Sequence, residues 1–129
     1  MKIKKCFASI IATILFGIVV MVSCKQKGQV TIAIVSFSKD IIPVFQVSCA
    51  LNASCHLGAN NANHKVNLDS SLAYNTILNK HLVIVNKPTA SLLYVQVVTG
   101  IMPKAPYGKL SDAQLILILN WISQGAKNN

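Results

Sequence analysis

Apolar residues recur at helical spacing in four separate stretches of the chain, which predicts a domain made of short α-helices. The first stretch, residues 38–48, begins with capping residues and has Pro43 early in the pattern, so the predicted helix runs into Cys49. A second helix is predicted after Asp69 or Ser70, because either side chain can cap it.

A third helix is predicted to open at Pro88 and to stop at Gly100, although its β-branched residues also allow a strand. The stretch IMPKAPYG then interrupts regular structure with two prolines and a glycine. The last helix is predicted to start at a capping box formed by Ser111 and Gln114 and to end at Gly125. These elements predict an all-α fold of about four short helices.

The last predicted helix is apolar on nearly all its sides, so it must be covered on more than one side. A small domain has few elements to cover such a surface. Either this helix packs tightly against the first helix, or a group other than protein fills the space. Trp121 and Phe45 are expected to be core contacts where the two helices cross.

Residues 1–23 have the order of an export signal. Three lysines precede an uncharged, largely apolar run of 16 residues, which is short for a membrane-spanning helix, and Cys24 follows it. This ending resembles the lipobox of bacterial lipoproteins and implies that Cys24 is lipidated, which would hold the protein to a membrane of the bacterial cell envelope. A signal anchor, or an ordinary signal peptide with an unrelated cysteine, is the alternative.

The segment 24–36 is predicted to be a tether that ends in an extended arm or a short strand, because its last part is β-branched and roughly alternating. The helical domain then occupies residues 37–129. Removal of the signal leaves nine lysines, three aspartates and no arginine, a net charge of +6. The lysines are scattered, which argues against nucleic-acid binding and favours a solvated surface. A weaker interpretation is that they steer docking onto an acidic partner.

Enzymatic residue sets are scarce in this sequence. It has no glycine-rich nucleotide loop and no glutamate, and its three aspartates lie apart at or near predicted helix starts, where capping explains them. Acid–base hydrolysis is therefore not expected.

The stretch VSCALNASCHLGA contains the chemistry that stands out. With the signal removed and Cys24 lipidated, Cys49 and Cys55 are the remaining thiols, and outside the cytoplasm such a pair is typical of a disulfide. However, His56 directly follows the second cysteine, as in the C-x-x-C-H motif for covalent haem attachment. Five residues separate the two cysteines here instead of two, so the loop between them must bulge.

Met102 is the one methionine left after signal removal, and it lies beside Pro103 in the irregular loop. A thioether is a common second ligand of haem iron in electron carriers. His64 and His81 are alternative ligands, but both lie in polar stretches and are expected to be solvated. Gly58 allows either a close approach of the backbone to a porphyrin or a turn.

The pieces KDIIPVFQVSC, CHLG and MPKAPYGKLSDAQLILILNWISQGA, in this order, resemble the small lipoprotein-anchored c-type cytochrome domains of bacterial envelopes. The resemblance covers about residues 36–126 and departs from the usual motif in its wide cysteine gap. It implies a cytochrome c-like fold around one haem c, with Cys49 and Cys55 as thioether attachments. It also implies His56 as the proximal iron ligand and Met102 as the distal one.

We therefore expect a membrane-anchored carrier that transfers one electron at a time to a redox protein partner. Both axial positions of the iron would be filled, so no catalysis of its own is expected. Two alternatives stay open. The first is a haem-free envelope lipoprotein module with a Cys49–Cys55 disulfide and a binding or scaffolding role. The second is a labile Met102 that opens the iron to a small ligand, which would give a sensor or a peroxidase.

Overall fold

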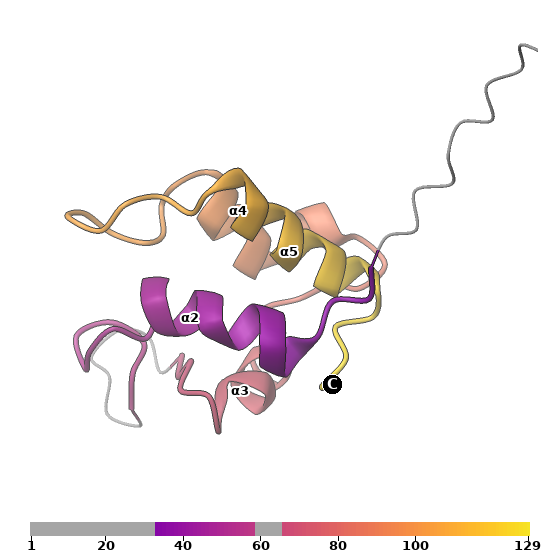
Figure 1. The fold of residues 1–129 in the computed structure, drawn as a ribbon, viewed down its shortest axis with the longest axis horizontal. Helices are drawn as coiled ribbons and strands as arrows, with labels where there is room; N and C mark the ends of the chain where they lie inside the picture. The colour runs from indigo at the N-terminus through magenta and orange to yellow at the C-terminus, as the bar shows by residue number, and fades with distance from the viewer. Residues whose placement is uncertain (1–32, 59–65) are drawn as a thin grey trace, which may run out of the picture. The chain divides into compact units, whose positions relative to one another are not determined.

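The computed structural model describes residues 33–58 and 66–129. Four α-helices lie within these ranges and no strand does, so the predicted all-α class is confirmed for them (Figure 1). The signal segment 1–23, Cys24, the tether up to residue 32 and His64 lie outside the described residues. No helix within the described ranges has the length and hydropathy needed to cross a membrane.

The first predicted helix is present and runs into Cys49, but it begins as a π-helical turn. This turn is η2 (Phe37–Ile41), and α2 (Ile42–Ser48) continues it. The Ser36 hydroxyl accepts a hydrogen bond from the Lys39 amide at 3.3 Å, which satisfies one of the free donors at the start of the turn. Pro43 lies in the first turn of α2, where a missing amide hydrogen is tolerated.

The second helix, α3 (Ala73–Asn79), starts after a turn that Asp69 closes. The Asp69 carboxylate accepts hydrogen bonds from the amide and the hydroxyl of Ser71 at 3.0 and 2.9 Å, and the first of these is the main reason that its pKa is lowered. The N-cap position itself is Leu72, which has no capping side chain. Asp69 therefore organises the entry to α3 without being its N-cap.

The third predicted helix is divided in two. Pro88 opens only the 3₁₀ turn η3 (Pro88–Ala90), and α4 (Leu92–Val98) starts after Ser91, whose backbone is extended. The Ser91 side chain is fully buried and accepts a hydrogen bond from the Ile84 amide at 2.8 Å. This bond ties the loop that contains Ile84 to Ser91, where the chain leaves η3 and enters α4. The prediction of a single helix that begins at Pro88 was therefore wrong. The strand alternative does not occur.

The last helix, α5 (Asp112–Ser123), matches its prediction at both ends. The capping box between Ser111 and Gln114 is present, and Gly125 has a φ of +101°, the left-handed conformation that ends many helices. The expectation of cover on more than one side holds only in part. Trp121 and its neighbours on the inner face are buried, but Ile116 on the outer face is 55% exposed.

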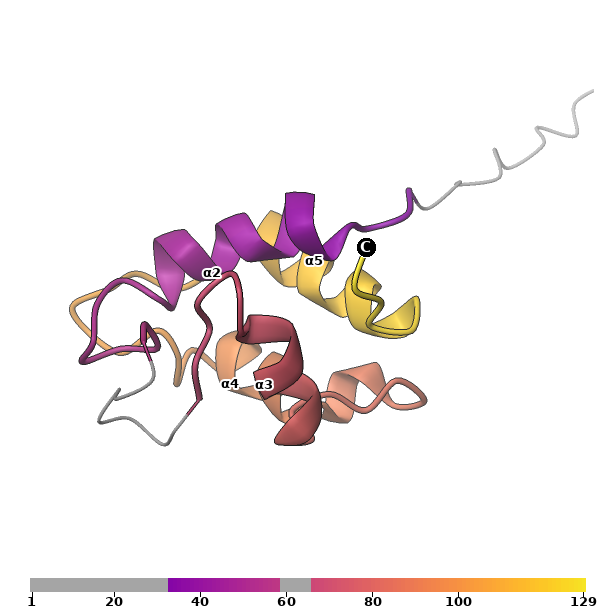
Figure 2. The same cartoon turned by 90° about the horizontal axis from the view of Figure 1, so that it is seen from below.

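An aromatic cluster forms the core where η2 and α2 cross α5 (Figure 2). The ring of Phe37 lies 5.1 Å from that of Trp121 and 6.3 Å from that of Phe45, measured between centroids. Both Trp121 and Phe45 are buried almost completely, which confirms their predicted core role. Tyr74 of α3 extends the cluster, with its ring 5.3 Å from Phe37.

The end of the N-terminal arm packs against the C-terminal segment without forming a strand. The amide of Val35 donates to the Gln124 side chain at 2.8 Å, and the Asn129 side chain accepts from the Phe37 amide at 2.9 Å. The hydroxyls of Ser36 and Ser38 both donate to the Asn129 carbonyl. We call this set of contacts the terminal clamp. It belongs to the compact unit Ala33–Asn129, which contains all described residues.

Candidate functional site

A large cavity in the described part of the molecule lies at the end opposite the terminal clamp. The loops 49–58 and 99–110 are both at that end in the two ribbon views (Figures 1 and 2). The cavity has a volume of about 800 Å³, within the range of roughly 300–1,000 Å³ that is typical of ligand sites. We call it the main cavity. Its walls are mostly apolar and include leucines 82, 92 and 93.

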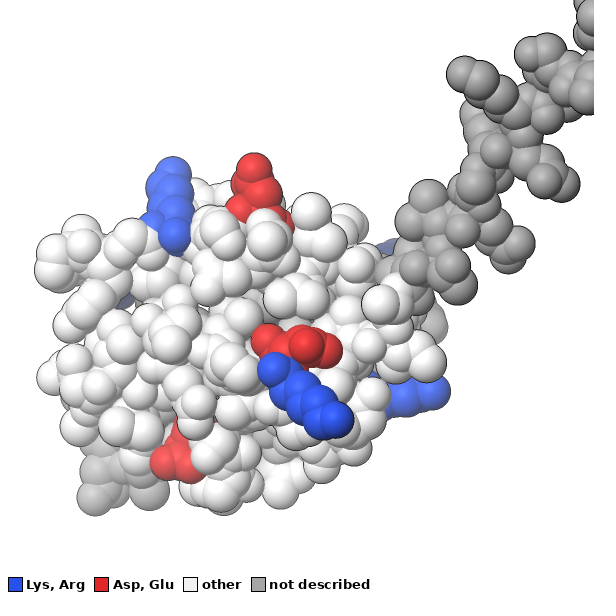
Figure 3. All heavy atoms as spheres, in the orientation of Figure 1, with Lys and Arg blue, Asp and Glu red and all other residues white. Residues whose placement is uncertain are grey.

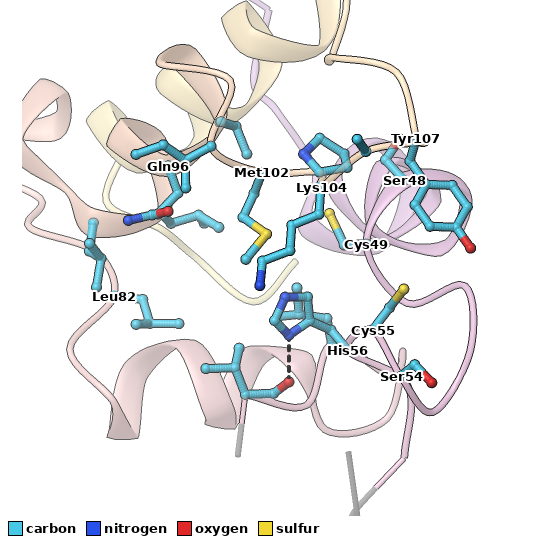
Figure 4. Close-up of a pocket in the computed structure, with 18 of the residues that line it drawn as sticks. Ser48, Cys49, Ser54, Cys55, His56, Leu82, Gln96, Met102, Lys104 and Tyr107 are labelled. Carbon is cyan, nitrogen blue, oxygen red and sulfur yellow. Dashed lines mark hydrogen bonds between the residues drawn. The ribbon is translucent and has the colours of Figure 1, made fainter. Parts of the chain in front are cut away.

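All four residues that the sequence predicts as the site line the main cavity. Cys49 is the C-cap of α2, Cys55 and His56 follow in the next turn, and Met102 lies in the loop after α4. Figure 4 shows Met102 on one wall and His56 on the opposite wall, while Cys49 and Cys55 lie together at one end. The fold therefore brings two segments that are far apart in the sequence to one site.

The wide gap between the cysteines is folded into a closed turn. The amide of His56 donates to the carbonyl of Cys49 at 3.1 Å, so the two ends of the loop meet. Within the loop, the Asn52 side chain accepts from the Ser54 amide at 2.9 Å and its carbonyl accepts from the Cys55 amide at 3.0 Å. The extra residues are thus absorbed by a turn around Asn52, and they do not separate Cys49 from His56.

The imidazole of His56 is held by a backbone carbonyl. Its Nδ1 lies 3.0 Å from the carbonyl oxygen of Val66, shown as the dashed line in Figure 4. A carbonyl only accepts hydrogen bonds, so Nδ1 must carry the proton. Nε2 then has a free lone pair, on the side of the ring that faces the main cavity. This arrangement is typical of a histidine prepared to bind a metal.

Met102 is held from the opposite side by α4. Its amide donates to the carbonyl of Gln96 at 2.9 Å, and the adjacent Pro103 is buried. The side chain of Met102 is half-buried and packs against the core cluster. The backbone of Met102 is therefore held in place, and its side chain points toward His56 (Figure 4).

The two cysteines are not bonded to one another. Burial and, to a lesser extent, the proximity of Cys55 together raise the pKa of the Cys49 thiol to about 11. Cys49 is therefore a neutral thiol at physiological pH, which makes it slow in spontaneous thiol–disulfide exchange. Both thiols are half-buried at the same end of the main cavity.

Gly58 and the alternative histidine have other roles. Gly58 has a φ of +86°, which favours glycine in a turn, and an added Cβ would meet no protein atom within 4 Å. His81 is exposed in the turn after α3 and does not line the main cavity. No cluster of three or more His, Cys, Asp or Glu side chains suited to a metal ion occurs within residues 33–58 and 66–129.

Several polar residues at the main cavity were not predicted from the sequence, namely Asn52, Ser54, Gln96, Lys104 and Tyr107. An asparagine two residues before a serine is typical of an Asx turn, so Asn52 carried a signal that could have been used. Gln96 and Lys104 carried none, because they reach the main cavity only through the packing of α4 and the loop that follows it.

Comparison of the chain with models of protein families, with curated proteins and with solved structures finds no match. The indication of a cofactor therefore comes from the side chains that line the main cavity. One imidazole nitrogen and one thioether lie on opposite walls of an apolar cavity, and two unpaired thiols lie at one end. These residues fit a haem, which needs two axial ligands and two thiols along one edge.

Proposed function

We propose that this protein is a membrane-anchored, c-type cytochrome-like electron carrier with a single haem. The observation that carries the proposal is the convergence of Cys49, Cys55, His56 and Met102 on one apolar cavity, with both thiols unpaired. A haem, when bound, supplies a one-electron couple between Fe(II) and Fe(III). The cytochrome c-like form of the all-α fold is part of this proposal.

The residues of the chain have separate roles in this function. His56 donates the Nε2 lone pair, and its bond to the Val66 carbonyl fixes the tautomer and the orientation of the ring. Met102 supplies a soft sulfur, which favours the reduced metal and raises the reduction potential. His56 and Met102 would together hold the iron on both sides and leave no position open to oxygen or peroxide, so the proposed function is electron transfer rather than catalysis.

The charged residues fit a transient encounter with a redox partner. Figure 3 shows only a few lysines and aspartates on the visible face, with a lysine directly beside an aspartate near its centre, so no basic patch covers it. Redox partners bind weakly, with interfaces often under about 1,200 Å². The net charge of +6 that remains after signal removal would favour an acidic partner and make the encounter sensitive to salt. The lipid on Cys24 would keep the carrier at the membrane.

The first test is production of the full chain in a bacterial host that matures c-type cytochromes. The purified protein is extracted with acid acetone, and the absorbance of the reduced polypeptide is recorded. We expect the haem colour to stay with the wild-type polypeptide and to be lost from the double variant Cys49→Ala/Cys55→Ala. A second variant, His56→Ala, is examined in the same way. Its matched control is His81→Ala, because His81 is exposed and lies away from the main cavity.

Two outcomes distinguish the alternatives. The first outcome is a colourless wild-type protein in which peptide mapping finds Cys49 linked to Cys55. This result would overturn the redox proposal and favour the haem-free module. A Met102→Leu variant keeps the side-chain volume but removes the sulfur. We expect it to retain the colour and to gain a spectral change with carbon monoxide in the reduced state. The same change in the wild type would instead favour a sensor or peroxidase with a labile Met102.

A further inference from the structure

The polar groups that line the main cavity are unevenly distributed. At the end with the cysteines, the side chains of Asn52 and Tyr107 lie within hydrogen-bond distance of each other, 3.5 Å, and Asn52 also accepts from the Ser54 amide. These groups are thus engaged with one another. Lys104 extends into the main cavity beside Met102, and on the side away from Cys55 the figure shows Gln96 and Leu82 (Figure 4).

Gln96 is a polar side chain in an apolar place. It lies on α4, is half-buried, and is flanked on the cavity wall by Leu92, Leu93 and Val97. Its backbone carbonyl accepts from Met102, but its side-chain amide has no hydrogen-bond partner among the described residues. A primary amide has two donors and one acceptor, and leaving such a group unpaired in an apolar wall is unfavourable. A ligand group in the main cavity would satisfy it.

The chemistry of the porphyrin identifies that group. A haem has its two vinyl groups along one edge, where the thiols add, and its two propionate carboxylates along the opposite edge. If Cys49 and Cys55 formed the thioethers, the carboxylate edge would point away from them, toward the side of the cavity where Figure 4 shows Gln96. We propose that the Gln96 side-chain amide donates a hydrogen bond to a haem propionate and so helps to set the reduction potential. This inference rests on the proposed function.

The expected electrostatic effect follows from the position of the carboxylate near the iron. A hydrogen bond from a neutral donor favours the ionised propionate and spreads its negative charge. Without the donor, the ionised propionate keeps a more localised negative charge, which stabilises Fe(III) relative to Fe(II). A second carboxylate at this position would add negative charge near the iron and strengthen this effect, while the proximity of the two carboxylates would raise the pKa of one of them.

The test measures the reduction potential of holo-protein variants as a function of pH. Gln96→Glu and Gln96→Leu are compared with Gln46→Glu and Gln46→Leu, since Gln46 is an exposed glutamine on α2 that does not line the main cavity. We expect Gln96→Glu to shift the Fe(II)/Fe(III) equilibrium about ten-fold toward Fe(III), which is about 59 mV for one electron. We also expect its potential to become pH-dependent, because the added carboxylate would interact with the propionate and with the ammonium of Lys104, which lines the same cavity. Gln96→Leu should shift in the same direction by less.

The two levels of the proposal fail in different ways. If the wild type carries no covalent haem, the proposed function fails, and the inference about Gln96 fails with it. If all five proteins carry haem and the Gln96 variants match the Gln46 variants in potential and pH profile, only the role of Gln96 is overturned. A purely structural role of Gln96 would lower stability or haem content without producing the new pH dependence.

Discussion

The two ends of the described molecule are completed in different ways. At one end, the terminal clamp pairs polar groups with each other, and the aromatic cluster of Phe37, Phe45 and Trp121 fills the space beneath it. At the other end, the loops 49–58 and 99–110 surround a cavity of about 800 Å³. The first end leaves only a small hollow of about 250 Å³ beside Trp121 and Asn129, whereas the second end leaves a much larger space between its side chains.

This difference separates residues that stabilise the fold from residues that shape the site. Protein interiors are normally packed with few voids larger than a water molecule, so a large cavity with apolar walls is not a requirement of folding. The rim of the main cavity also exposes large apolar side chains, such as Leu92 at 49% and Ile101 at 55%. We therefore expect the packed end to determine the stability of the haem-free chain, and the cavity end to determine what the chain binds.

The largest expected loss of stability comes from substitution of Trp121. Trp121→Ala should lower the free energy of unfolding of the haem-free chain by about 3–5 kcal/mol, because it removes the largest buried side chain of the aromatic cluster. Leu92→Ala, at the rim of the main cavity, should cost less than about 1 kcal/mol because the side chain is already half exposed. Urea denaturation followed by circular dichroism measures both values. Similar losses for the two variants would contradict the division into a packed end and a cavity end.

Because Trp121→Ala can prevent folding altogether, Trp121→Phe provides a milder change in the same cluster. It retains an aromatic ring but removes the indole nitrogen, which donates to the carbonyl of Lys127 at 2.9 Å. We expect Trp121→Phe to fall between the wild type and Trp121→Ala in stability. The order of the three proteins is then the result to be compared with Leu92→Ala.

The next largest loss of stability is expected for a substitution in the terminal clamp. Asn129→Ala removes the acceptor of the Phe37 amide, which belongs to a buried residue, so the expected loss is about 1–3 kcal/mol. Asn128 is exposed and supplies the matched control, with an expected change within about 0.5 kcal/mol for Asn128→Ala. Thermal unfolding of the haem-free variants gives the comparison. Equal stability of the two would mean that the Asn129 side chain contributes nothing measurable to the terminal clamp.

Local signals explain why much of the fold was predictable from the sequence. The capping box at Ser111 and the stop at Gly125 depend on residues within one turn, and both ends of α5 were predicted correctly. The start of α4 was predicted wrongly, because Pro88 is a good first residue for either a 3₁₀ turn or an α-helix. What decides between them is the buried hydroxyl of Ser91, whose partner Ile84 belongs to a different loop.

The candidate site was predictable only in its reactive residues. The resemblance predicted that Cys49, Cys55, His56 and Met102 would surround one group, and all four line one cavity. The carbonyl that orients His56 comes from Val66, and a backbone group has no sequence signal. The turn that absorbs the wide cysteine gap likewise depends on a backbone contact between Cys49 and His56.

A smaller effect is expected where α5 meets the loop that holds Met102. Ser111→Ala removes the N-cap hydrogen bond to the Gln114 amide and should cost about 1 kcal/mol. Ser111→Asp can keep the acceptor and should be close to the wild type. Hydrogen exchange of the loop 99–110 in the haem-free chain provides a second measurement. Faster exchange of this loop in Ser111→Ala, with α3 unchanged, would show that the cap at the start of α5 also holds the wall with Met102.

The smallest expected effect concerns the Cys49 thiol in the reduced, haem-free chain. The folded state raises its pKa from 9.0 to about 11, first by burial and then through Cys55. Between these two values the folded chain keeps a proton that the unfolded chain has lost, so stability is complete below pH 9 and falls as the pH rises toward 11. At pH 9.5 the loss should be under about 1 kcal/mol.

Lysines and tyrosines also ionise at high pH, so the comparison must be a difference between proteins. Unfolding midpoints of the wild type and of Cys49→Ala are measured at pH 7.5 and 9.5 under reducing conditions. The wild type should lose more stability than the variant, because alanine has no proton to release. If the two lose the same amount, Cys49 is not shielded from water. The main cavity would then be open at the end with the cysteines, and the thiols would be available for disulfide exchange before any haem is attached.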